Sequence, residues 1–224
     1  MTSPVSTELF KLKETSVSYG DFVALKKISL SIEAGEKIAI IGPSGAGKST
    51  LLKHLYEAQP EKCSVIHQDF ALIKQLSVFH NVYMGRLNQN TLFKNIRNFF
   101  FPEKDKLADI SEILNELEIN EKLHTKIAAL SGGQQQRVSI CRALYHNAPI
   151  VLGDEPVSSL DPKNAQRVIE RLMQKEKTVI LSLHNVELAL KYSQRVIALK
   201  EGQIAFDSKA TDISKEQIKE LYDQ

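Results

Sequence analysis

One motif constrains this chain more than any other: a glycine-rich loop that follows a short apolar strand and precedes a helix. The strand is predicted at Lys37–Ile41 (KIAII), the loop reads GPSGAGKS, and a helix is predicted from Thr50 to about Tyr56. Glycines let the backbone curl until its N–H groups point inward, and the start of a helix adds a partial positive charge. This GxxxxGK[ST] spacing is typical of a phosphate-binding loop. A glycine-rich turn without a ligand is the alternative.

The positions of the loop have separate expected tasks. Lys48 is expected to reach the β- and γ-phosphates of a nucleotide, and the Ser49 hydroxyl to take one Mg²⁺ position. The backbone N–H groups of the loop are expected to surround the phosphates. The predicted nucleotide-binding residues of this segment are Gly42, Pro43, Ser44, Gly45, Ala46, Gly47, Lys48, Ser49 and Thr50.

A second apolar run, Ile150–Leu152, leads into two neighbouring acids, Asp154 and Glu155. Carboxylates at the carboxyl end of a parallel strand lie where α/β proteins bind their ligands. Asp154 is predicted to hold Mg²⁺, and Glu155 to polarise the attacking water as general base. An acidic pair after a strand is by itself more often a solvated turn, but together with the phosphate loop it indicates a P-loop NTPase.

The order of the other elements predicts an α/β fold. The runs 178–183 and 195–200 are short, apolar and β-branched, as buried parallel strands are, and Asp161-Pro162 is a good helix start. Alternation within 9–32 suits an N-terminal antiparallel β subdomain. The segment 76–147 offers helical periods and no convincing strand. We therefore predict one domain, 1–224, with a RecA-like core at about 1–75 and 148–224 and an inserted helical subdomain at about 76–147.

Composition narrows the class of protein. The 29 Lys and Arg residues nearly balance the 27 Asp and Glu residues, and no long run of one sign indicates a nucleic-acid partner. Cys63 and Cys141 fit neither a CxxC pair nor a zinc pattern, which favours a reduced cytosolic protein. No apolar run approaches the ~20 residues that span a bilayer. We therefore expect another chain to hold this one at any membrane.

The segment Leu130–Gln134 (LSGGQ) is a third motif. A serine followed by two glycines at a helix start offers N–H groups and a hydroxyl to an anion, although the same residues can be a simple helix cap. With this motif the chain, from about Leu9 to Asp207, resembles the nucleotide-binding subunit of ATP-binding cassette (ABC) transporters. The resemblance implies ATP as the nucleotide and a head-to-tail homodimer. In that dimer Ser131, Gly132, Gly133 and Gln134 complete the site whose phosphate loop belongs to the opposite subunit.

Further roles come from the same resemblance, since each residue type alone would be unremarkable. Tyr19 matches the aromatic residue that stacks on adenine, and Gln68 matches the glutamine that touches Mg²⁺ and the attacking water. His184 matches the histidine that contacts the γ-phosphate and helps to orient Glu155. The segment Ser158–Asp161 matches a loop that crosses the dimer interface, while helix capping is an equally good reason for Asp161, and both roles can hold.

Three stretches are similar to the ATPase subunit of phosphonate-type importers: Ile41–Leu52, Asn81–Leu87 and Ser182–Leu190. This similarity implies an ATPase that couples ATP-driven dimerisation to import of a phosphonate or related oxyanion. It also implies a permease in the membrane, a periplasmic or extracellular binding protein, and a place on the cytoplasmic face. A non-import membrane process, such as lipoprotein release or cell-division signalling, is one alternative. A soluble ABC protein of DNA repair or translation is another, although those usually carry two cassettes or a long coiled-coil insert.

Two segments raise separate questions. Only twenty positions separate Lys48 from Gln68, where ABC cassettes usually carry additional antiparallel strands, so part of that sheet is predicted to be missing. The aromatic run 91–101 (TLFKNIRNFFF) suits either the core of the helical subdomain or a docking surface for the permease. Near the end of the sequence, Ser214 and Gln217 are predicted to form a capping box for a short helix.

Overall fold

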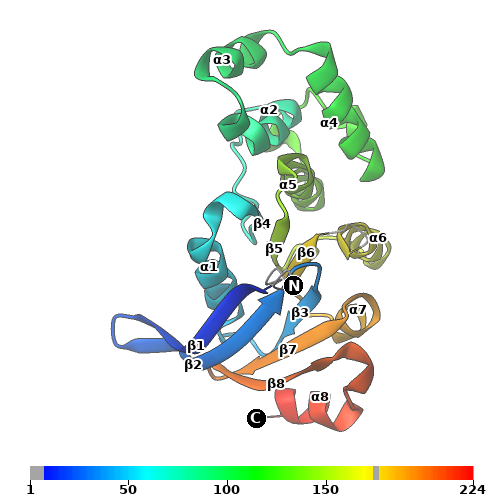
Figure 1. Cartoon of the computed structure of the whole chain (residues 1–224). Coiled ribbons are helices and arrows are strands. Elements are labelled where there is room, and N and C mark those ends of the chain that lie inside the picture. Colours follow the sequence, from blue (N-terminus) through cyan, green and yellow to red (C-terminus); the bar gives the residue numbers. More distant parts are fainter. Residues whose placement is uncertain (1–7, 174–176, 224) are drawn as a thin grey trace, which may run out of the picture. The chain divides into compact units, whose positions relative to one another are not determined.

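The structure is a computed structural model that describes residues 8–173 and 177–223, and these residues form two compact units (Figure 1). The first unit contains the chain up to Cys63, Pro149–Glu155 and the chain from Ile169 onward. The second unit contains Ser64–Ala148 and Pro156–Val168. The first unit carries the strands of both sheets apart from residues 64–66 of β4, and the second is mainly helical.

A six-stranded sheet with the order β4-β5-β6-β3-β7-β8 organises the first unit. Strands β5, β6, β3 and β7 run parallel, and β8 is antiparallel to β7. Every residue of β3 and β6 is buried, which is why these strands were visible as continuous apolar runs. The strands are β3 (Lys37–Ile41), β4 (Cys63–Ile66), β5 (Ile150–Asp154), β6 (Thr178–Ser182), β7 (Arg195–Lys200) and β8 (Gln203–Lys209).

The edge strand β8 was not predicted from the sequence. Its residues alternate between exposed and half-buried, and its polar positions hide any apolar run. Within the sheet it pairs only with β7, so its extended conformation depends on that neighbour rather than on its own residues. Strand β5 is also longer than predicted, because it continues through Gly153 to Asp154.

The predicted N-terminal antiparallel sheet consists of only β1 (Glu8–Tyr19) and β2 (Phe22–Glu33). Between α1 (Lys48–Ala58) and β4 the chain forms a single short 3₁₀ turn at Pro60–Lys62. The prediction that this segment lacks antiparallel strands is therefore confirmed. Since an isolated pair of strands is marginally stable, the pair depends on its packing against the rest of the unit. The Lys26 N–H, for example, donates to the Gly202 carbonyl at 2.8 Å.

The second unit contains the helices of the predicted insertion. Between Leu76 and Asn147 the structure has helices and 3₁₀ turns, and one isolated bridge joins Ser77 to Lys126. The free cysteines Cys63 and Cys141 are both buried, as small apolar residues would be. The main helices of the insertion are α2 (Val78–Tyr83), α3 (Leu92–Phe100), α4 (Lys104–Glu116) and α5 (Gly132–His146). The remaining helices are α6 (Pro162–Met173), α7 (Val186–Tyr192) and α8 (Lys215–Tyr222), and α8 begins with the predicted capping box.

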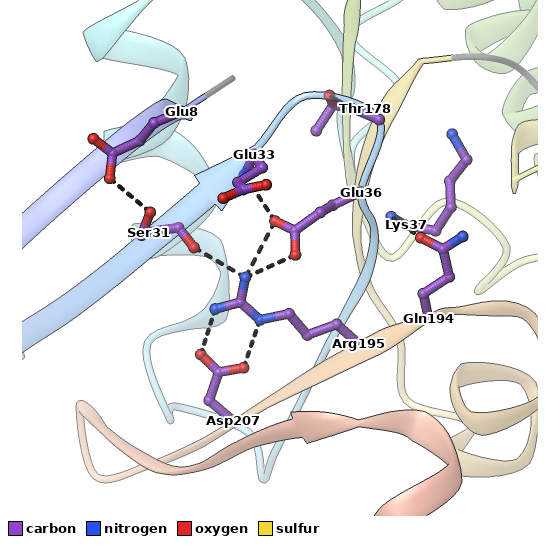
Figure 2. A network of polar contacts seen from close by, with 10 residues as sticks. Glu8, Ser31, Glu33, Glu36, Lys37, Thr178, Gln194, Arg195 and Asp207 are labelled. Atoms are coloured by element: carbon purple, nitrogen blue, oxygen red, sulfur yellow. Dashed lines mark hydrogen bonds and ion pairs between the residues drawn. The ribbon is translucent and has the colours of Figure 1, made fainter. Parts of the chain in front are cut away.

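An ion-pair network fastens β1, β2 and the sheet at the amino-terminal ends of the parallel strands (Figure 2). The guanidinium of Arg195, the first residue of β7, forms two hydrogen bonds with the Asp207 carboxylate, at 2.7 and 2.6 Å. It also donates to Glu36 and to the Ser31 carbonyl, both at 2.9 Å. These carboxylates raise the pKa of Arg195. The phosphate loop follows the opposite end of β3, so we assign this network to stability.

Replacing Arg195 with methionine is expected to lower the free energy of unfolding by about 2 kcal/mol, because Asp207 and Glu36 would lose their shared cation. Urea unfolding measures the change. Glu57→Gln is the matched control: it removes an exposed pair with Lys53 at 3.8 Å, which should matter by less than about 0.5 kcal/mol. Equal effects of the two substitutions would contradict the assignment.

Candidate functional site

Three neighbouring strands of the first unit end at the same level of the sheet. In the pairing of β6 with its two neighbours, Ser182 lies opposite Ile40 of β3 and opposite Asp154 of β5. The phosphate loop follows β3, the acidic pair ends β5, and His184 follows β6. The parallel sheet thus brings together the residues of the first unit that the sequence predicted for the phosphate end of a nucleotide site.

The phosphate loop has the backbone geometry of an anion site. Gly42, Gly45 and Gly47 have φ angles of 143°, 79° and 101°, which residues with a side chain rarely adopt. Gly47 is the N-cap of α1 and supplies no side-chain cap, and the first turn of α1 holds no acidic residue. Its first N–H groups therefore remain available to a bound phosphate.

The Lys48 side chain is folded onto its own loop. Its ammonium donates to the Gly42 carbonyl at 2.8 Å and to the Pro43 carbonyl at 3.0 Å, and the residue is only 6% exposed. Burial lowers the pKa of Lys48, while the negative charges of Glu155 and Asp154 oppose that shift. Phosphate oxygens are stronger acceptors for an ammonium than neutral carbonyls, so a nucleotide can displace these two bonds.

Ser182 joins the two acids, a role that the sequence did not reveal. Its hydroxyl donates to Asp154 Oδ1 at 2.7 Å and accepts the Glu155 N–H at 2.9 Å. Asp154 and the exposed Ser49 are hard oxygen donors, which suit Mg²⁺ held by one carboxylate, water and substrate phosphates. In the part of the chain that the structure describes, no group of three or more His, Cys, Asp or Glu side chains could hold a metal alone.

The Glu155 carboxylate lies against His184. The distance from His184 Nε2 to Glu155 Oε1 is 2.5 Å, with the glutamate side chain 15% exposed and the histidine 52% exposed. Glu155 also has a φ of 50°, in the left-handed region that is uncommon for residues with a side chain. An unusual backbone conformation held by hydrogen bonds is characteristic of functional sites.

Tyr19 lies at the tip of the β1–β2 hairpin, opposite Phe22. Its ring is half exposed, and the Lys53 ammonium of α1 lies 5.5 Å from the ring centroid. An exposed ring near the phosphate-loop helix is able to receive a flat base. Stacking of Tyr19 on adenine stays a prediction.

The second unit contains the other predicted site residues, which are Gln68, Ser131, Gly132, Gly133 and Gln134. Gln68 is exposed in the turn after β4. Arg142 of α5, which the sequence analysis did not single out, fixes that turn by donating to the Phe70 carbonyl at 2.9 Å and the Ala71 carbonyl at 2.6 Å. Both of these loop residues have positive φ angles.

The LSGGQ segment forms the start of α5. Ser131 is the N-cap, with the Gln134 N–H donating to its oxygen and the Ser131 N–H donating to the Gln134 side chain. The simple capping interpretation is thus confirmed, and the Ser131 hydroxyl proton can still serve an anion. Gly133 allows close approach of the Ser159 carbonyl, which would lie 2.9 Å from an added Cβ.

A buried glutamine connects this helix start to the segment 158–161. Gln136 accepts the Ser159 N–H at 2.8 Å and donates to the Ser158 hydroxyl at 3.4 Å. The predicted capping by Asp161 is confirmed as well: its carboxylate accepts the Asn164 N–H at 3.2 Å, and hydrogen bonds from Asn164 lower the pKa of Asp161. A role of this segment in dimer contact stays a prediction.

Comparison with known proteins identifies the family of the chain. A family described as "ABC transporter" matches residues 25–158. The phosphonates import ATP-binding protein PhnC of Rhizobium etli is 35% identical over 243 positions, covering 96% of this chain and 86% of that protein. PhnC of Fusobacterium nucleatum is 36% identical, covering 96% and 98%. Since 243 aligned positions exceed the 224 residues of this chain, the alignments leave gaps in it.

Solved structures of ABC transporter cassettes are similar to this chain as well. The dimeric ABC transporter cassette MJ0796 is 29% identical, with a TM-score of 0.78 over 89% of this chain and 98% of that one. A post-hydrolysis form of MJ0796 bound to ADP and Pi has a TM-score of 0.73 over the same shares. Among the described residues, no helix combines the length and apolar character needed to cross a membrane. The chain belongs to the ABC transporter family, as an ATP-hydrolysing cassette.

Proposed function

We propose that this chain is the ATPase of an importer for phosphonate or a related oxyanion. The observation that carries the proposal is its 35–36% identity, over 96% of its length, to proteins named as phosphonates import ATP-binding proteins. The cassette itself supplies the ATP-driven movement. The substrate would bind to the membrane and extracellular partners instead.

In the proposed reaction, the phosphate loop and Lys48 bind the phosphates of ATP and orient the γ-phosphate. Glu155 accepts a proton from the attacking water, and His184 holds the Glu155 carboxylate toward that water. Asp154 and Ser49 are proposed to hold Mg²⁺, which would stabilise negative charge that develops on the phosphates. These roles of Asp154 and Ser49 as Mg²⁺ ligands, and the stacking of Tyr19 on adenine, are proposed from the family pattern.

The proposed assembly is a homodimer of cassettes on the cytoplasmic face of the membrane, bound to a permease. In this arrangement Ser131, Gly132, Gly133 and Gln134 act on the ATP of the opposite subunit, and Gln68 links Mg²⁺ and water to the permease contact. ATP binding closes the dimer and hydrolysis opens it, so that the permease receives a rigid-body movement. A binding protein outside the membrane would deliver the substrate.

The exposed face of α3 supports a permease contact in the second unit. Phe93 is 77% exposed and Phe100 is 68% exposed, with Leu92, Ile96 and Phe101 also exposed nearby. Polar residues hold the helix in place, since Asn95 accepts the Tyr83 hydroxyl at 3.0 Å and donates to the Leu87 carbonyl at 2.9 Å. A set of large apolar side chains left in water is typical of a protein interaction site. The docking interpretation of the run 91–101 is therefore the one we retain.

The test is co-purification of the tagged chain from detergent-solubilised membranes of its native host, with mass spectrometry of the bound proteins. We expect a membrane permease, and we expect the double variant Phe93→Ser, Phe100→Ser to lose at least about 90% of it, because an interface depends on a few large apolar anchors. The ATPase activity of the isolated variant should stay within about twofold of the original.

Phe22→Ser is the matched control, because Phe22 is 64% exposed and lies on the β1–β2 hairpin of the other unit. It should leave the permease bound. A complex without any membrane protein would contradict the importer proposal. A permease that stays bound to the double variant would contradict only the role of α3.

A further inference from the structure

The end of β6 holds Glu155 at two points. Ser182, the last residue of β6, accepts the Glu155 backbone N–H at 2.9 Å. His184, two residues later, lies 2.5 Å from the Glu155 carboxylate. One short segment of chain thus fixes both the backbone and the side chain of the proposed base.

The hydroxyl of Ser182 has no freedom to serve other partners. Ser182 is fully buried, and its single hydroxyl proton goes to Asp154 Oδ1 at 2.7 Å. Asp154 is in direct register with it on β5, so the bond joins two neighbouring strands. This bond restricts the rotation of the Asp154 carboxylate and uses only one of its two oxygens.

The backbone of Glu155 needs such a fixed partner. Its φ of 50° is uncommon for a residue with a side chain, and the hydrogen bond from its N–H to Ser182 supports this conformation. Without the Ser182 oxygen, the Glu155 N–H would lose this hydrogen bond, and we expect the peptide to relax toward a more common conformation. Such a change would move the carboxylate away from its place beside His184.

We propose that Ser182 is a positioning residue for ATP hydrolysis, whose hydroxyl sets the geometry of Glu155 and Asp154 together. The inference rests on the roles proposed above for these two acids. It assigns to a buried serine in an apolar strand a task that neither the sequence motifs nor the family resemblance attach to it.

The test compares two variants of the same shape, Ser182→Thr and Ser182→Val. Both substitutions add volume at the same buried position, but only threonine keeps a hydroxyl. Steric effects therefore cancel in the ratio of the two kcat values. We expect kcat of the valine variant to fall about 10- to 100-fold below that of the threonine variant. The Mg²⁺ concentration for half-maximal activity should also rise several-fold.

Two further measurements separate positioning from simple loss of structure. The Kd for ATP without Mg²⁺, measured by equilibrium binding, should agree within about twofold between the variants, because the phosphate loop keeps its contacts. Their midpoints of thermal unfolding should also be similar. A valine variant that loses ATP binding and thermal stability in parallel with its activity would overturn the proposal in favour of a structural role.

Ser182→Ala tests the proposal without added volume if the branched variants do not fold. Its control is Ser139→Ala, because Ser139 is fully buried in α5 and its oxygen has no hydrogen-bond partner among the described residues. We expect kcat to fall about tenfold or more in the first variant and to remain unchanged in the second. Ser182 variants as active as the original chain, with Glu155→Gln inactive, would overturn this inference and leave the proposed function intact.

Discussion

Glu155→Gln is expected to lower the rate of ATP hydrolysis by about 100-fold or more while leaving ATP binding intact. An amide cannot accept the proton of the attacking water, and removing a general base typically costs this much. Glutamine has the same shape, so the contact with His184 and the hydrogen bond of the backbone N–H to Ser182 can persist. Phosphate release at saturating MgATP measures the effect, and equilibrium binding of ATP shows whether the site survives.

Glu201→Gln is a close control for this substitution. Glu201 also has a φ near 50°, at 51°, but it lies exposed in the turn between β7 and β8. The control therefore repeats the same chemical change on the same kind of backbone, outside the proposed site. A Glu155→Gln variant whose turnover stays within about threefold of the original would show that another group is the base.

A bound state should accumulate when hydrolysis is blocked in this way. If ATP joins two cassettes as proposed, the Glu155→Gln variant should elute as a dimer with MgATP and as a monomer after its removal. A variant that has lost turnover but stays a monomer with MgATP would contradict the proposed assembly and leave the assignment of the base intact.

The parallel strands were predictable because they are buried on both faces and therefore appear as apolar runs. β3 and β7 have the predicted bounds, and β6 ends one residue before the predicted end. β8 was missed because its side chains alternate in burial and its conformation depends on pairing with β7. Edge strands of this kind carry little signal in the sequence, since the neighbouring strand decides their conformation.

The residues of the phosphate loop could be predicted because the spacing of the glycines indicates the backbone conformation of the loop. A glycine pattern after a strand predicts positive φ angles, and Gly42, Gly45 and Gly47 have them. Ser182 could not be recognised in the same way, since its task depends on register with Asp154, 28 residues earlier in the chain. Arg142 was missed for the same reason, because its acceptors lie 71 and 72 residues away.

The chain lacks the antiparallel strands that ABC cassettes usually carry between α1 and β4, and the phosphate loop keeps its geometry without them. The segment between α1 and β4 contains only a short 3₁₀ turn, yet the phosphate loop before it keeps its positive φ angles and its contact with Lys48. The loop is held by the main sheet, through the Gly202 N–H donating to the Ala46 carbonyl at 3.2 Å, and not by the N-terminal hairpin alone. Loss of strands at that edge is therefore compatible with an intact phosphate site.

That support from the main sheet leads to a second large effect, at Gly42. A Cβ added to Gly42 would lie 2.1 Å from the Leu199 carbonyl oxygen of β7, which is far inside van der Waals contact. The φ of 143° adds strain for any residue with a side chain. Gly42→Ala must therefore displace either the loop or β7, and the Gly42 carbonyl that binds Lys48 would move with it.

We expect Gly42→Ala to raise the Kd for ATP by more than tenfold and to lower the free energy of unfolding by about 2–4 kcal/mol, because overpacking and backbone strain act together. Gly35→Ala isolates the strain: Gly35 has a φ of 87°, but an added Cβ would meet no atom within 4 Å. That control should cost about 1 kcal/mol and leave the Kd unchanged. Equal Kd values for the two variants would mean that the close approach of Gly42 to β7 does not shape the nucleotide site.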